Sequence, residues 1–142
     1  MLVFELSHLF FRSDGELIYS PKNLGLFYSY ENAQKAIQYY CIQPGFRENT
    51  DAFSIQRKEV LGDITNDTIF EVIIYLHSNH YEFEVEIELG LYGDKNTAQT
   101  ILSEYCNENV ALLSIKNLVV ERIINKCLID RKQWSEGFLI SE

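Results

Sequence analysis

The sequence predicts an α+β protein that duplicates a strand–strand–helix–strand unit, with a mainly antiparallel sheet, two helices and a pseudo-two-fold arrangement of the two copies. Short motifs recur at a fixed separation of 65 residues: Leu24-Gly25-Leu26 returns as Leu89-Gly90-Leu91, and Tyr40-Cys41 returns as Tyr105-Cys106. Each pair of motifs also brackets the same succession of a strand pattern and an amphipathic helix pattern. An internal repeat explains both observations.

The repeats define the expected domain organisation. A chain of 142 residues with 46% hydrophobic residues can bury a proper core. We expect residues 1–142 to form one compact domain, with repeat one at about 1–63, repeat two at about 67–130 and a C-terminal tail at 131–142. A unit of about 60 residues has little core of its own, so the copies are expected to share one, as a fused homodimer would.

The first repeat is expected to begin with two strands, because strand-forming residues alternate with turn signals. Ser29 is a helix cap, and Ala33, Ala36 and Tyr40 follow the helical spacing of an apolar stripe. The expected order is strand 2–11, turn 13–16, a second strand at 17–19 and 24–28 interrupted at Pro21, a helix ended by Pro44-Gly45, and a strand from Phe53.

The second repeat has the same order. Ile69-Phe70-Glu71-Val72 opens it, Ser78-Asn79-His80 is the expected turn, and Asp94 caps a helix whose stripe includes Ala98 and Ile101. Leu118-Val119-Val120 begins its last strand, and the tail motif Trp134–Phe138 has no counterpart in the first repeat.

Charge and cysteine content restrict the class of function. The formal net charge of −9 disfavours binding to nucleic acid or to an anionic membrane and favours a basic protein partner. Cys41, Cys106 and Cys127 are an odd number without C-x-x-C spacing, which favours a reduced, cytoplasmic setting over disulfides or zinc. The N-terminus lacks a signal-peptide pattern, and no uncharged apolar run is long enough to span a membrane.

A row of glutamates is the sharpest local feature. Glu82, Glu84, Glu86 and Glu88 alternate with apolar residues, so period-two geometry predicts four carboxylates on one sheet face. A plain solvent-exposed face is one interpretation, and a face that binds Lys and Arg of a partner protein is the other. A straight row cannot converge on a metal ion, and equivalent carboxylates do not form an acid–base pair.

No other pattern indicates a cofactor, a metal or a catalytic site. His8 is expected to be a hydrogen-bonded structural histidine, and His77 and His80 flank a turn without nearby cysteines. The sequence has no nucleophile elbow and no glycine-rich phosphate loop. Tyr28 and Tyr30, at the turn between strand and helix, are candidate interface anchors.

Four stretches resemble a small uncharacterised bacterial domain family similar to the immunity proteins of polymorphic-toxin and contact-dependent inhibition systems. They are residues 23–33, Pro44-Gly45-Phe46, Phe53-Ser54-Ile55 and Trp134-Ser135-Glu136-Gly137-Phe138. The second repeat departs from the pattern, with Gly93-Asp94 in place of Tyr-Ser. These motifs are structural, so the resemblance transfers no catalytic residue.

These observations lead to a functional hypothesis. We expect a non-enzymatic bacterial immunity protein that binds and neutralises a cognate toxin, which would be basic and of the nuclease type. The partner-binding residues would be Glu82, Glu84, Glu86, Glu88, Tyr28 and Tyr30. An alternative is a small-molecule-sensing or regulatory module with a ligand site between the repeats, and an enzyme with a site built from distant residues is a third.

Overall fold

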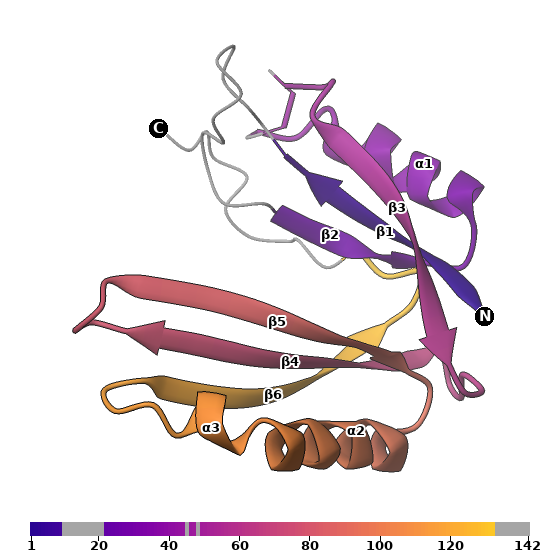
Figure 1. The fold of residues 1–142 in the computed structure, drawn as a ribbon. Coiled ribbons are helices and arrows are strands. Elements are labelled where there is room, and N and C mark those ends of the chain that lie inside the picture. The colour runs from indigo at the N-terminus through magenta and orange to yellow at the C-terminus, as the bar shows by residue number, and fades with distance from the viewer. Residues whose placement is uncertain (10–21, 45, 48, 133–142) are drawn as a thin grey trace. The chain divides into compact units, whose positions relative to one another are not determined.

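The computed structural model describes residues 1–9, 22–44, 46–47 and 49–132, and its fold class is α+β, as predicted (Figure 1). The elements in chain order are β1 (Leu2–His8), β2 (Lys22–Phe27), α1 (Tyr30–Tyr40), β3 (Phe53–Leu61), β4 (Thr68–Ser78), β5 (Phe83–Tyr92), α2 (Lys95–Glu108), α3 (Val110–Leu113) and β6 (Val119–Leu128). Hydrogen bonding orders the strands β2-β1-β3-β5-β4-β6.

The chain divides into two compact units. The N-terminal unit consists of Leu2–Lys58 with Leu128–Glu142, and the C-terminal unit consists of Met1 with Glu59–Cys127. Each unit therefore takes a short piece from the other half of the sequence. The strand β3 runs from one unit into the other.

The N-terminal unit is built on the antiparallel pair β1–β2, with β3 beside β1. The helix α1 begins where Ser29 predicts it, because the Ser29 hydroxyl accepts a hydrogen bond from the Asn32 amide at 3.1 Å. The apolar stripe of this helix packs on the strands to form the core. The buried residues of this core are Leu6, Leu24, Phe27, Ala33, Ala36, Tyr40 and Phe46.

The C-terminal unit is built on the long antiparallel hairpin β4–β5, with β6 on the other side of β4. The carboxylate of Asp94 caps α2 by accepting a hydrogen bond from the Thr97 amide at 2.9 Å. The helix α2 packs on one face of β4 and β5, at the end of the hairpin away from its turn (Figure 1). Val72, Tyr92 and Ala98 form the buried core there.

Both hairpins contain a bulge beside a glycine, and these two glycines lie 65 residues apart in sequence. The register of β1–β2 shifts beside Gly25, and that of β4–β5 shifts beside Gly90, so the second strand of each hairpin carries one extra residue. Both glycines have positive φ, 134° and 122°. A Cβ at either position would also meet the aromatic ring two residues later, Phe27 or Tyr92, at 3.4 Å or less.

The end of β3 and the residue that directly follows β6 each pair in parallel with the second strand of a hairpin. In the C-terminal unit, Val60 pairs with Leu91, and Leu61 pairs with Tyr92. In the N-terminal unit, an isolated parallel bridge joins Leu26 to Ile129. Leu26 and Leu91 lie 65 residues apart in sequence, and each directly follows a glycine of positive φ, Gly25 or Gly90. The two pairings therefore occur at corresponding places in the two hairpins.

Some details differ from the sequence-based expectations. The short helix α3 was not predicted. The second hairpin turn contains Asn79–Glu82, one residue later than expected. The expected turn at 13–16, the strand at 17–19, Pro21 and the tail motif at 134–138 lie outside the described residues.

Replacing Gly25 with alanine is expected to lower the free energy of unfolding by about 1–3 kcal/mol, because positive φ strains a residue with a side chain. The new Cβ would also lie 2.6 Å from the carbonyl oxygen of Arg131. Gly62→Ala is the matched control, since Gly62 has φ +87° but no atom nearer than 4.0 Å to its Cβ. Urea denaturation should show the larger loss for Gly25→Ala, and equal losses would contradict the close-approach argument.

Candidate protein-binding face

The negative charge of the chain is concentrated in the C-terminal unit. Its sequence contains twelve Asp and Glu against four Lys and Arg, a net charge of −8. The N-terminal unit has nine against eight, or −1, which together give the −9 of the whole chain. No Lys or Arg occurs between Lys58 and Lys95, a stretch that contains nine acidic residues. A basic partner would therefore be attracted to this unit.

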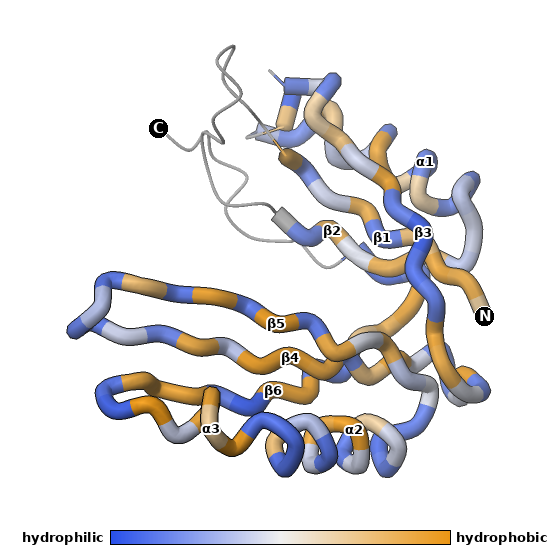
Figure 2. Tube along the Cα trace, viewed as in Figure 1, coloured by the Kyte–Doolittle hydropathy of each residue, from blue (hydrophilic) through white to orange (hydrophobic). Residues whose placement is uncertain are grey.

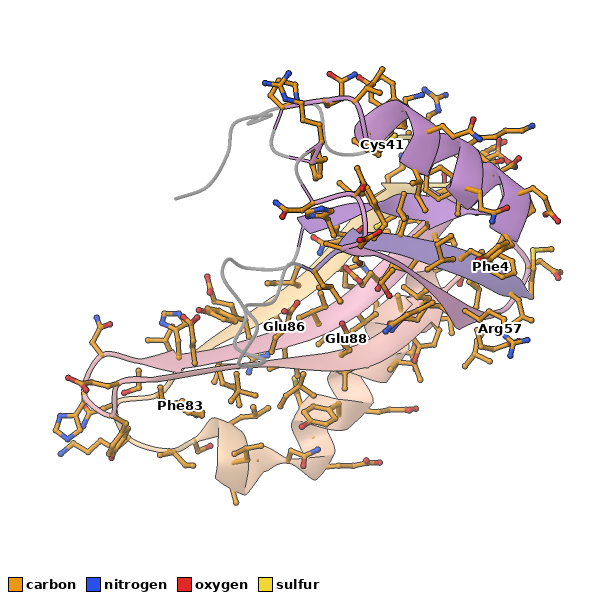
Figure 3. The ribbon with its side chains drawn as sticks, turned by 90° about the horizontal axis from the view of Figure 1, so that it is seen from above. Phe4, Cys41, Arg57, Phe83, Glu86 and Glu88 are labelled. Carbon is orange, nitrogen blue, oxygen red and sulfur yellow. The ribbon has the colours of Figure 1, made fainter. Side chains whose placement is uncertain are left out.

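Three of the predicted glutamates lie in a row on β5. Glu84, Glu86 and Glu88 are exposed and alternate along the strand, and Glu86 and Glu88 are labelled on it in Figure 3. Two of their cross-strand partners on β4 are polar: His77 lies opposite Glu84, and Tyr75 lies opposite Glu86. The third partner, opposite Glu88, is Ile73.

The fourth glutamate departs from the prediction. Glu82 is the last residue of the turn before β5, and its φ of 47° is left-handed and not extended. Strand alternation therefore does not place Glu82 in the row, although the residue is exposed. The turn takes up the four residues between β4 and β5, so the predicted strand began one residue too early, at Glu82.

Neighbouring strands add polar groups to this row. The Tyr75 hydroxyl donates a hydrogen bond to a Glu84 carboxylate oxygen at 2.5 Å, and the Nε2 of His77 lies 3.3 Å from a carboxylate oxygen of Glu121 on β6. We define the acidic face as Glu84, Glu86 and Glu88 with Tyr75, His77 and Glu121. The hydrogen bond to Glu84 raises the pKa of Tyr75 above 10.0, and desolvation and the nearby carboxylates act in the same direction.

The opposite side of β5 is apolar but incompletely covered. Leu89 and Ile87 are half-buried, and Leu89 packs against the core beneath α2. Phe83 and Val85 are 39% and 41% exposed. Figure 2 shows the resulting alternation of hydrophobic and hydrophilic residues along β5. This half of the strand therefore exposes side chains on both of its faces.

The two candidate tyrosines belong to the N-terminal unit. Tyr30 is 48% exposed at the start of α1, and its ring lies edge-on to Phe4 with 6.3 Å between centroids. Tyr28 is half-buried, and its amide donates a hydrogen bond to Asp130 at 3.1 Å. The exposed ring of Tyr30 is thus accessible to a partner, whereas Tyr28 also has a structural contact.

The structure places His8 in the core of the N-terminal unit. His8 is buried against the rings of Phe46 and Phe53, and its Nε2 donates a hydrogen bond to the Asn49 carbonyl oxygen at 3.0 Å. The expectation of a hydrogen-bonded structural histidine is therefore confirmed. Among the described residues, no group of three or more His, Cys, Asp or Glu could hold a metal ion.

Two described pockets each have a volume of about 310 Å³ and a largely polar lining. The pocket in the C-terminal unit lies at the turn end of the β4–β5 hairpin, beside the acidic face. Its lining residues are His77, Ser78, Asn79, Glu82, Phe83 and Glu84. The pocket in the N-terminal unit is lined by Phe27, Asn32, Lys35, Ala36, Asp130 and Lys132. Neither of these two pockets is lined mainly by apolar side chains.

Sequence reasoning missed the contributions of Tyr75, His77 and Glu121 to the acidic face. Tyr75 and His77 alternate on β4 as the glutamates do on β5, so the spacing of the hairpin could have suggested their placement. Glu121 follows a 14-residue helix and α3, and no local signal indicates which strand β6 joins.

Comparisons of this chain with protein-family models, with curated proteins and with solved structures find no match. Within the described residues, no helix is both long and apolar enough to cross a membrane.

Replacing Glu84 with glutamine should lower the pKa of Tyr75 toward 10.0, because the mutation removes the carboxylate that favours the neutral phenol. Any stabilisation from this contact is present below pH 10 and is lost as the pH rises through the raised pKa. Titration followed by NMR of ¹³C-labelled tyrosine rings measures the shift. Glu88→Gln is the control, since Glu88 is not among the causes of the raised pKa. An unchanged pKa in Glu84→Gln would contradict the hydrogen bond.

Proposed function

We propose that this chain is a non-enzymatic immunity protein of a bacterial cytoplasm, which binds a cognate toxin and blocks its activity. The toxin would be basic and of the nuclease type. One observation carries the proposal: an exposed acidic face lies in a unit with a net charge of −8 and no Lys or Arg between Lys58 and Lys95.

The spacing of the carboxylates supports recognition of a basic protein. Alternate residues on a strand lie about 7 Å apart, so each neighbouring pair of carboxylates repels by about 0.6 kcal/mol in water. Lys or Arg side chains of a partner would relieve this repulsion and would be attracted to the whole row. Such complementarity raises the association rate and opposes wrong partners.

A nuclease is a suitable partner because it must present cationic side chains to the phosphate backbone of its substrate. An acidic face that pairs with those side chains competes directly with nucleic acid. Inhibition by occlusion needs no reaction machinery in the inhibitor.

We also infer that the two halves arose by duplication and retain the predicted pseudo-two-fold relationship. The bulge glycines Gly25 and Gly90, the helix caps Ser29 and Asp94, and the order strand–strand–helix–strand recur in both halves. The unequal charge of the two units suggests that only the C-terminal unit kept or acquired the acidic surface.

Growth rescue tests the function directly. The chain is co-expressed in bacteria with the toxin domain encoded beside its gene, and colony growth is compared with that of cells expressing the toxin alone. We expect rescue together with a stable complex in size-exclusion chromatography. A toxin that kills equally well in the presence of the chain would overturn the proposal.

Reversing the charge of Glu84 and Glu86 to lysine should slow association with the toxin by roughly 10-fold or more at low salt and weaken the salt dependence of the rate. The matched control is Glu104→Lys with Glu108→Lys, which makes the same charge change on exposed positions of α2. Stopped-flow or surface-plasmon measurements give the rates. Equal slowing by both double variants would show that net charge acts and that the acidic face does not.

A further inference from the structure

Among the described strands, β5 has no neighbour along most of one edge. Its neighbours are β4 and β3, and β3 pairs with it only where Val60 and Leu61 meet Leu91 and Tyr92. From Phe83 to Leu89, the edge away from β4 pairs with no other strand among the described residues. Alternate amide and carbonyl groups of an extended strand point toward such an edge. They can therefore form hydrogen bonds with an added strand.

Both faces of β5 beside this edge are accessible. Glu84 and Glu86 are exposed on one face, and Phe83 and Val85 are 39% and 41% exposed on the other. An added strand would extend both surfaces, because directly opposed residues of paired strands point to the same face. Its side chains would meet carboxylates at every second position and apolar groups between them.

We propose that β5 receives an extended segment of the partner protein by strand addition along Phe83–Leu89. This proposal rests on the proposed function and specifies how the partner binds. The segment carries Lys or Arg at alternate positions, facing Glu84, Glu86 and Glu88, and apolar residues at the intervening positions, facing Phe83, Val85 and Ile87. Backbone hydrogen bonds supply affinity, and the alternating side chains supply specificity.

The end of β3 limits the length of the segment. Since Val60 already occupies the edge beside Leu91, the added strand has about seven residues of β5 to pair with, or about 23 Å. A short extended segment of the partner, and not a whole sheet, fits this space.

A peptide of the required pattern provides the test: acetyl-Lys-Val-Lys-Val-Lys-Val-Lys-amide, added to the full chain labelled with ¹⁵N. We expect it to slow hydrogen exchange at edge-facing amides within 83–89. A second peptide has the same side chains and charge but is N-methylated at its five central amides. We expect the unmodified peptide to bind roughly 10- to 100-fold more tightly, because N-methylation removes the donors of the added strand.

Variants of the protein locate the site. Val85→Lys places a charge on the apolar face of the edge and should weaken binding of the unmodified peptide at least fivefold. Val119→Lys makes the same charge change at a residue that is 49% exposed on β6 and should weaken it less than twofold.

Equal affinity of the two peptides would overturn strand addition while leaving electrostatic binding to the acidic face in place. Failure of the unmodified peptide to protect the 83–89 amides would also overturn it, as would slow exchange of the edge-facing amides in the free protein. Growth rescue by the chain is scored separately, so a failure of the proposed function remains distinguishable from a failure of strand addition.

Discussion

Parallel pairing at the end of β3 and directly after β6 is the constraint on which both compact units depend. A strand–strand–helix–strand segment of about 60 residues has one sheet face to cover and little apolar surface to bury. Val60 and Leu61 complete the C-terminal unit beside Leu91 and Tyr92, and Ile129 bridges to Leu26 in the N-terminal unit. Val60 and Ile129 are both buried. Neither half of the sequence therefore contains all of the residues of its own unit.

Close approach of the backbone at these pairings explains why glycine occurs at positions 25 and 93. A Cβ on Gly25 would lie 2.6 Å from the Arg131 carbonyl oxygen, and one on Gly93 would lie 2.2 Å from that of Asp63. Both contacts involve the segment that directly follows a last strand. Glycine is needed there because the incoming chain occupies the space of a side chain.

The same glutamates can favour one partner and oppose another. An unpaired strand edge is a hazard, since two copies could pair along it and aggregate. If two β5 strands paired, however, their carboxylate rows would lie side by side, and like charges on paired strands repel. A segment with alternating Lys or Arg would experience attraction instead. The acidic face thus disfavours self-association and favours a basic partner through the same electrostatic interaction.

Prediction from the sequence succeeded where a local signal determines local structure. Ser29 and Asp94 are both helix caps, and the strand alternation of β5 correctly predicts exposed carboxylates at Glu84 and Glu86. It failed at Glu82, because alternation alone does not show where a strand ends and a turn begins. The short helix α3 was also missed, since one helical turn has too few residues for a periodic pattern.

The sequence by itself determined the order of the elements, the caps and the alternation along β5, because each depends on residues close together in the chain. Only the tertiary structure decided that Tyr75, His77 and Glu121 accompany the glutamates. It also decided that, of the described strands, β3 reaches only the Leu91–Tyr92 end of its edge of β5. Those features depend on strand pairing between residues far apart in sequence. Pairing of this kind is fixed by the packing of the whole unit and leaves no local pattern in the chain.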